Sequence, residues 1–391
     1  MHTQVFLLAK GDDFLTKREH MLALLHGESD MIPSWTQSFF SVNTAVRLIG
    51  NSLVSDDILP SRDYKKGAVS RENRLKNLKL TKKLDNYSIG VGKGGNFFFG
   101  HGGPGEFRDK IIQLEKNKIT SRFETGVKKE IKFEPYFYEM KDHLVQGAED
   151  IEKMILPNPL DEKRYEGVKE DVDFYKKAGY FVYANLNGFF SGLHYFFCPY
   201  DKLLLNMALN PDFIMKMLKN LGEFNLAAAE QLLKCGVDCI TFCEDMGSGN
   251  SLLFSPEMYE YYFFPWHKQL ADLCHDYKAF LHMHSHGNIN KIIDKIFETG
   301  IDMINPIDPY ENMMLEELFE KSSGKQVLVG GINKFFFEWD RETKYEFLKK
   351  VIRVGKKYRK FILMDSGGIP DDLAKDEFEY YLKISRKLRY R

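Results

Sequence analysis

From residue 180 onward the sequence repeats one pattern six times: a short apolar run rich in β-forming residues, a polar turn, and an amphipathic stretch of helical period. Six such units in series build a parallel sheet with right-handed crossovers. The predicted strands are 180–186, 238–243, 279–284, 301–307, 326–332 and 361–366. The predicted helices lie at about 201–234, 255–277, 288–299, 311–321, 340–357 and 374–388, and helix starts are marked at 210–212 (NPD) and 255–257 (SPE).

The N-terminal part contributes a seventh strand. Residues 16–19 (TKRE) form a capping-box pattern before an apolar-periodic helix that runs through Leu25, and residues 31–35 (MIPSW) indicate a strand. Residues 85–138 differ from these repeating units in composition and pattern. The glycine-dense segment 90–105 is followed by alternating polar and apolar residues. This alternation is typical of an antiparallel hairpin or meander inserted in the barrel, and the eighth barrel strand is expected nearby.

These elements predict the α/β class and, within it, a (β/α)8 TIM barrel with an N-terminal elaboration. An open doubly wound sheet is the alternative. The predicted organisation is an N-terminal helical segment at 1–30 and a single barrel domain at 31–391, with an inserted β-rich excursion at about 60–140.

Composition excludes several classes of protein. With 55 Lys+Arg against 56 Asp+Glu, the net charge of −1 argues against a nucleic-acid binder, which needs clustered cations. No run reaches the roughly 18 apolar residues that a membrane span needs, and residues 1–13 lack a secretory pattern. Five cysteines without paired spacing indicate reduced thiols. The expected location is therefore cytoplasmic.

Two patterns resemble sites but favour a structural interpretation. The glycine-rich segment 90–105 contains GxGxxG-like spacings, yet its flanks do not have the strand and helix that a phosphate loop requires. Cys235, Cys239 and Cys243 are evenly spaced, but they cross from a helix end into a strand and are not expected to share one face. Buried structural cysteines are the favoured interpretation.

Three histidines alternate at the end of the strand 279–284. Strand alternation places His282, His284 and His286 on one side if the strand continues that far. Imidazoles at the active face of a barrel suit Zn²⁺. For His282 a packed core position is preferred, whereas metal ligation is preferred for His284 and His286.

Acidic residues end neighbouring strands. Glu244 and Asp245 follow one strand, Asp365 ends another, and Asp308 follows a third. All should reach the same rim of the barrel, where enzymes of this fold place their chemistry. Each carboxylate could complete the coordination sphere of a metal ion, act as a base, or cap a helix N-terminus.

Four segments in order resemble the uroporphyrinogen decarboxylase and cobalamin-dependent methyltransferase superfamily. They are 16–33 (TKREHMLALLHGESDMIP), 244–246 (EDM) leading into 252–265 (LLFSPEMYEYYFFP), 284–289 (HSHGNI) and 330–332 (GGI). The likeness covers nearly the whole chain and implies a TIM barrel.

Departures from the family pattern favour its methyltransferase branch. The decarboxylases carry arginines just after the first strand for the propionates of their substrate, whereas residues 35–40 here are WTQSFF. The methyltransferase branch has a zinc motif, His-x-Cys-Gly, with a distant Cys. His284 matches the His, His286 stands at the Cys position, and the distant Cys falls at about Gly367.

The resemblance therefore implies a zinc enzyme with altered ligands. The predicted ligands are His284, His286 and Glu244, with Asp245 or Asp365 as a catalytic acid or orienting group. Two imidazoles and a carboxylate make a harder Lewis acid than two thiolates, suited to an ether oxygen. The residues assigned to substrate binding are Trp35, Phe39, Phe40, Asn187 and Asp308.

The predicted function is transfer of a methyl group from a small methylated substrate, a methoxylated aromatic compound, to the cobalt of a corrinoid protein. The partners are thus that substrate and a corrinoid protein, with no nucleic acid and no membrane, and a homodimer is left open. The alternatives are a corrinoid-to-thiol methyltransferase, a decarboxylase, and a barrel without catalysis.

Overall fold

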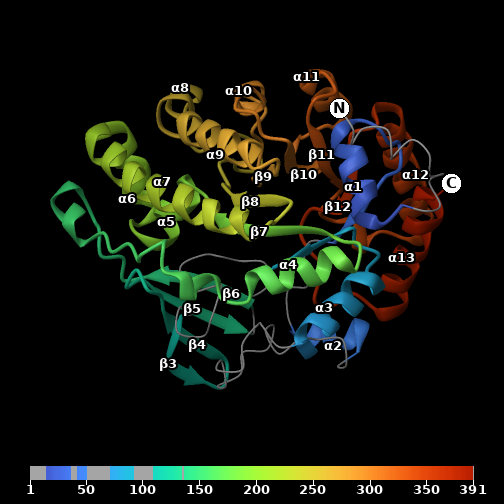
Figure 1. Ribbon diagram of the computed structural model, residues 1–391, viewed down its shortest axis with the longest axis horizontal. Coiled ribbons are helices and arrows are strands. Elements are labelled where there is room, and N and C mark those ends of the chain that lie inside the picture. Colours follow the sequence, from blue (N-terminus) through green and yellow to red (C-terminus); the bar gives the residue numbers. More distant parts are fainter. Residues whose placement is uncertain (1–14, 37–41, 51–70, 92–108, 134–135, 391) are drawn as a thin grey trace.

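The computed structural model describes residues 15–36, 42–50, 71–91, 109–133 and 136–390. Eight parallel strands form its main sheet, in the order β1-β12-β11-β10-β9-β8-β7-β2, with helices around them (Figure 1). The strands are β1 (Ser34–Trp35), β2 (Ser88–Gly90), β7 (Phe181–Asn187), β8 (Cys239–Cys243), β9 (Phe280–His284), β10 (Met303–Ile307), β11 (Val327–Ile332) and β12 (Phe361–Asp365). The predicted TIM barrel is confirmed.

The two end strands of this sheet approach each other and nearly close the barrel. The Tyr87 N–H donates a hydrogen bond to the Ser34 carbonyl over 3.1 Å, and the Ser34 hydroxyl donates to the Asp85 carbonyl over 2.7 Å. The eighth strand that the sequence left unplaced is β2. It spans three residues, too few to show a periodic pattern.

Helices cover the barrel between the strands. They are α1 (Lys17–His26), α2 (Val42–Ile49), α3 (Arg71–Lys83), α4 (Val168–Lys177), α5 (Phe190–Phe196), α6 (Tyr200–Leu209), α7 (Pro211–Lys234), α8 (Pro256–Met258), α9 (Phe264–Asp276), α10 (Ile293–Glu298), α11 (Leu315–Ser322), α12 (Arg341–Tyr358) and α13 (Lys375–Arg389). Among the residues described, no helix is both long and apolar enough to cross a membrane.

Local signals set the helix ends. The capping box is present: the Glu19 N–H donates to the Thr16 hydroxyl and the Thr16 N–H donates to the Glu19 carboxylate. The predicted helical range 201–234 contains two helices: α6 ends at Leu209, and α7 begins at Pro211, as the helix start marked at 210–212 predicted. Proline lacks the N–H that a continuous helix needs at that point.

A separate antiparallel sheet lies in the connection between β2 and β7. Its strands are β3 (Lys110–Glu115), β4 (Lys118–Arg122), β5 (Lys128–Phe133) and β6 (Tyr136–Lys141), paired in sequence order, and we call this sheet the meander. The Tyr138 and Tyr195 hydroxyls lie 3.2 Å apart, and the Phe123 and Phe196 ring centroids are 5.3 Å apart. The meander therefore packs on α5, at one side of the barrel.

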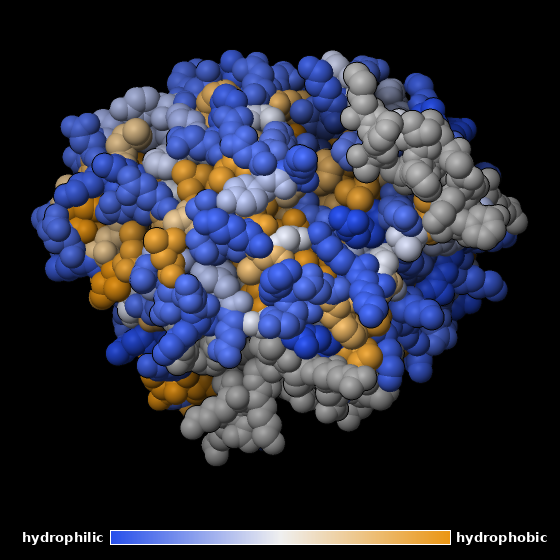
Figure 2. Space-filling model, viewed as in Figure 1, coloured by the Kyte–Doolittle hydropathy of each residue, from blue (hydrophilic) through white to orange (hydrophobic). Residues whose placement is uncertain are grey.

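The barrel interior is filled by side chains rather than open. Buried residues from facing strands form one apolar cluster there, including Phe181, Cys239, Met303, Val329 and Ile362. A larger cluster lies between the sheet and the helices. On the face seen in Figure 2, apolar surface occurs in small groups among hydrophilic side chains, as expected of a near-neutral globular protein.

A buried ionic network joins the two ends of the chain at Asp85. Its carboxylate accepts from the Lys17 ammonium over 2.8 Å, from the Tyr390 hydroxyl over 3.1 Å, and from Arg389. Burial alone would raise the pKa of Asp85, but Arg389 and Lys17 outweigh it and hold the pKa below its ordinary value. The network ties α1 and α13 to the turn before β2.

Replacing Asp85 with asparagine is expected to lower the free energy of unfolding by about 3 kcal/mol at neutral pH, since it leaves buried cations without a counter-charge. The pKa of Asp85 is lower in the folded than in the unfolded protein. The stability that ionised Asp85 contributes is therefore fully present above its unfolded pKa and is lost as the pH falls through its folded pKa. Urea denaturation across pH checks it. Asp272→Asn, in an exposed pair with Lys268, should change stability by no more than about 0.5 kcal/mol. Equal losses in both variants would contradict the assignment.

Candidate functional site

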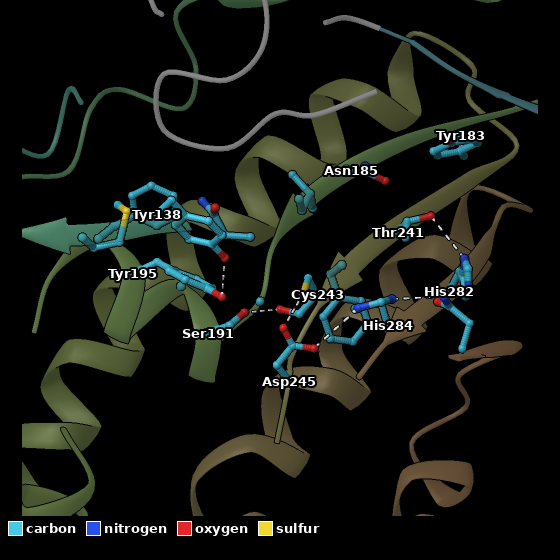
Figure 3. A pocket seen from close by; sticks show the side chains of 18 of the residues that line it. Tyr138, Tyr183, Asn185, Ser191, Tyr195, Thr241, Cys243, Asp245, His282 and His284 are labelled. Carbon is cyan, nitrogen blue, oxygen red and sulfur yellow. Dashed lines mark hydrogen bonds and ion pairs between the residues drawn. The ribbon is translucent and has the colours of Figure 1, made fainter. Parts of the chain in front are cut away.

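A cavity of about 440 Å³ lies at the carboxyl ends of the barrel strands. Residues from six barrel strands line it, joined by residues of α5 and of the meander. Figure 3 shows Tyr138 and Tyr195 on one side, Tyr183 and His282 on the other, and Cys243 and Asp245 between them. This is the end of the barrel at which the fold places catalytic side chains.

Three side chains in the cavity could hold a metal ion. Ligand atoms of Cys243, Asp245 and His284 all lie within 4.8 Å of one another, and we call these residues the rim cluster. Nε2 of His284 is 3.5 Å from Oδ1 of Asp245, and Sγ of Cys243 is 3.6 Å from Oδ2 of Asp245. No other such group occurs among the residues described.

Strand register brings the cluster together. Cys243 is the last residue of β8 and pairs with His284, the last residue of β9. Asp245 then turns back at a φ of 25°, and its Oδ1 accepts from the His286 N–H over 3.0 Å.

The loops after β8 and β9 touch backbone to backbone. A Cβ on Gly287, whose φ is 88°, would lie 2.2 Å from the carbonyl carbon of Gly247. Only glycine allows this approach, which places Asp245 beside the end of β9.

The protonation states suit metal ligation. Burial lowers the pKa of His284 and so favours the neutral imidazole. Burial raises the pKa of Asp245, but His284 and the His286 N–H outweigh it and the pKa is lowered. Burial holds the Cys243 pKa well above its usual value. That thiol stays protonated unless a cation offsets the cost of the thiolate.

Asn305 orients the imidazole. Its side-chain amide lies 3.0 Å from Nδ1 of His284, which leaves Nε2 facing Asp245. The contact fixes the orientation of the ring, and Nε2 has a lone pair for a metal when the amide is turned so that its oxygen accepts from Nδ1–H.

Of the residues predicted to act in the site, four line the cavity. Asp245 and His284 belong to the rim cluster, and Trp35 and Asn187 line the wall. Both polar side-chain atoms of Asn187 are buried and have no hydrogen-bond partner among the described residues. His282, expected to be a packed residue, is 1% exposed, and its ring centroid lies 5.0 Å from that of Trp35.

Glu244 is not brought to the cluster. Its carboxylate is fully buried and accepts from the backbone N–H groups of Phe189 and Phe190 over 2.6 and 2.8 Å. His267 contacts the same carboxylate over 2.9 Å, and the Tyr259 hydroxyl contacts the other ring nitrogen of His267 over 3.1 Å. Glu244 thus caps α5 and anchors α9, and both its oxygens are occupied.

His286 lies at the edge of the cluster. Its ring centroid is 4.8 Å from that of His284, but its Nδ1 lies 3.3 Å from the Glu311 carboxylate. Its side chain is 36% exposed, and it is not among the residues that line the cavity. The structure thus pairs His286 with Glu311 rather than with the rim cluster.

The remaining predicted residues lie elsewhere. Asp308 accepts from the Ser366 hydroxyl over 2.7 Å and from the Tyr310 N–H over 2.9 Å, which starts the turn Pro309–Glu311. Asp365, at the end of β12, is 1% exposed and does not line the cavity. Phe39 and Phe40 lie outside the described residues, as does nearly all of the glycine-rich segment.

Cys243 is the site residue that the sequence interpretation missed. The expectation of buried structural cysteines holds for Cys239, which is buried in the barrel, whereas Cys243 is half-buried, lines the cavity and belongs to the rim cluster. Alternation along β8 places Cys239, Thr241 and Cys243 on one side of the strand. That period, applied to the strand alone, would have placed Cys243 at the rim.

Fold and site together define a TIM-barrel protein with a cavity and a titratable cluster at the catalytic end. Residues 131–388 match the family model described as uroporphyrinogen decarboxylase (URO-D). This span is more than half of the chain, which therefore belongs to the uroporphyrinogen decarboxylase family, as the sequence resemblance indicated. No curated protein matches the chain.

Two solved structures share the fold. A methyltransferase from Methanosarcina mazei is 13% identical with a TM-score of 0.66, covering 96% of this chain and 100% of that one. A B12-independent methionine synthase from Shewanella sp. W3-18-1 is 12% identical with a TM-score of 0.51, covering 92% of this chain and 97% of that one. At such identities the likeness shows the fold alone.

Proposed function

We propose that this protein is a methyltransferase that moves a methyl group from a small methoxylated aromatic compound to the cobalt of a corrinoid protein. The observation that carries the proposal is the rim cluster of Cys243, Asp245 and His284 within an aromatic-walled cavity. Family membership supports it, and so does the fold shared with a methyltransferase and a methionine synthase.

The rim cluster fits Zn²⁺. A thiolate, a carboxylate and a neutral imidazole are all common zinc ligands, and three protein ligands leave a fourth position open, as in catalytic zinc sites. Cys243 and Asp245 therefore replace Glu244 and His286 in the proposed ligand set. Bound there, Zn²⁺ supplies a Lewis acid that polarises a substrate oxygen or sulfur atom.

The chain's own residues bind and orient the substrate. The Trp35 and Tyr183 ring centroids are 4.7 Å apart and offer an aromatic wall for a substrate ring. Asn187 pairs with Cys243 in the β7–β8 register, so its unpartnered amide lies beside the cluster. From there it can donate a hydrogen bond to the oxygen that loses the methyl group, which stabilises the developing negative charge.

Cys243 also favours a second direction of transfer, from a methylated corrinoid to a thiol. A thiolate ligand makes a bound zinc ion more electron-rich than two imidazoles and a carboxylate would, and an electron-rich site keeps a thiol acceptor nucleophilic. The proposed ligand set is thus softer than the set that the sequence predicted.

One assay separates the two directions. Purified zinc-loaded protein is given cob(I)alamin with 2-methoxyphenol or 4-methoxybenzoate, or methylcobalamin with a small thiol, and the cobalamin absorbance is followed. We expect zinc-dependent formation of methylcobalamin from the aromatic ether. Transfer to the thiol alone would reverse the proposed direction, and absence of both reactions would contradict a methyltransferase.

A further inference from the structure

The cavity contains a single cation among the residues described, and it comes from the meander. Lys129 lies on β5 and lines the cavity, with Nζ 4.5 Å from the centroid of the Tyr138 ring. No arginine and no other lysine is among the described lining residues. Tyr138 in turn contacts Tyr195 of α5, so the cation is held at the side of the cavity where the meander meets the barrel.

Lys129 has no ionic partner in the described part of the chain. Its side chain forms no ion pair or hydrogen bond there, and its ammonium lies over the aromatic face of Tyr138. Burial lowers the pKa of Lys129, with only a partial opposing effect from Asp109. Among the described lining residues the single carboxylate is Asp245, which is engaged with His284 and the His286 N–H. The cavity therefore offers a positive charge that no described carboxylate pairs with directly.

Buried polar atoms at the other side of the cavity also lack partners in the described part of the chain. Both amide atoms of Asn187, a residue that is 1% exposed, are buried without a hydrogen bond to any described residue. Buried polar groups are nearly always satisfied, so such a group lining a cavity indicates a ligand or water that bonds to it. The ligand is therefore polar at the rim cluster as well as at Lys129.

The number of cationic side chains that line the cavity limits the negative charge that a bound anion can carry. The N-terminus of α5 would be the natural site for a phosphate, but Glu244 already accepts from the N–H groups of Phe189, Phe190 and Ser191. One lysine remains, which matches one negative charge. A substrate with several carboxylates, such as a porphyrinogen, would bring charges that the described lining cannot balance.

We propose that the cavity selects small aromatic monocarboxylates, whose carboxylate binds Lys129 while the methyl-bearing end lies at the rim cluster. This rests on the proposed methyl transfer and names its class of substrate. It also assigns substrate selection to the meander, because the chemistry comes from barrel strands and the anion-binding group comes from β5. The Tyr138–Tyr195 contact fixes the distance between the two.

Direct binding tests this without any methyl transfer. Isothermal titration calorimetry compares 4-methoxybenzoate with 4-methoxybenzamide, which has the same shape and no charge, for wild type, Lys129→Met and Lys132→Met. We expect wild type to bind the benzoate about 10- to 100-fold more tightly than the amide, as for a hydrogen bond between charged groups. Lys129→Met should lose this preference. Lys132, exposed on the same strand and outside the cavity lining, is the matched control and should keep it.

The outcomes separate this inference from the proposed function. Equal binding of the amide and the benzoate by wild type, or an unchanged preference in Lys129→Met, would overturn the inference even if methyl transfer occurs. A preference that depends on Lys129 would support it even if no methyl group reaches cobalamin. Retained binding of the amide by Lys129→Met shows that the cavity is intact. Failure of wild type to bind the benzoate also overturns the inference.

Discussion

Replacement of His284 with alanine is expected to lower methyl transfer to cobalamin at least 100-fold, since loss of an outer-shell partner alone costs about 10- to 100-fold in metal affinity or activity. His284 supplies the imidazole of the rim cluster, and Asn305 orients it from the far side. The side chain borders a cavity, so its loss should leave the fold intact. Cobalamin absorbance gives the rate, and mass spectrometry gives the zinc content.

The matched control for His284 is His26→Ala. His26 is exposed at the end of α1, where its ring contacts Phe280 at a centroid distance of 5.7 Å. It is not among the residues that line the cavity, and both rate and zinc content should stay at wild-type levels. A His284→Ala protein that keeps its zinc and its rate would remove His284 from the site.

Replacement of Glu244 with alanine is expected to lower the free energy of unfolding by about 3–5 kcal/mol, because each buried donor left without an acceptor costs about 1–3 kcal/mol. The change deprives the N–H groups of Phe189 and Phe190 of their acceptor and removes the contact with His267. Because Glu244 lies between Cys243 and Asp245 in the chain, the rim cluster should loosen as well. Urea denaturation measures the loss.

Two further variants serve as controls for the Glu244→Ala measurement. Glu244→Gln keeps an acceptor for α5 and should lose less stability than Glu244→Ala. Glu298→Ala breaks an exposed pair with Lys295 and should cost no more than about 0.5 kcal/mol. If Glu244→Ala were as stable as Glu298→Ala but lost its zinc, Glu244 would be a metal ligand, as the sequence interpretation had it.

The barrel could be predicted because six of its strands carry their own pattern. Each predicted strand from 180 onward starts or ends within two residues of the observed one, as for β9, predicted at 279–284 and found at Phe280–His284. The eighth strand could not be placed, because β2 has three residues and is identified only by its pairing with β7. The helix start marked at 210–212 is confirmed, because α7 begins at Pro211.

The sequence predicted where the site lies in the barrel, but not all of the residues that form it. His284 and Asp245 could be predicted to lie at one rim, because each follows or ends a strand and the carboxyl ends of parallel strands meet at the same end of the barrel. It could not show that Glu244 turns away toward the N-terminus of α5, which depends on a contact with Phe189 and Phe190. Nor could it place Lys129, since the position of the meander against α5 is set by tertiary packing.

X-ray absorption at the zinc edge tests the central claim most directly, because it counts the ligands of the bound metal. The rim cluster of Cys243, Asp245 and His284 predicts one sulfur neighbour at about 2.3 Å and nitrogen or oxygen neighbours at about 2.0–2.2 Å. Cys243→Ser should remove the sulfur signal alone. A spectrum of zinc-loaded wild type without sulfur, or with two sulfur neighbours, would contradict the rim cluster as the metal site.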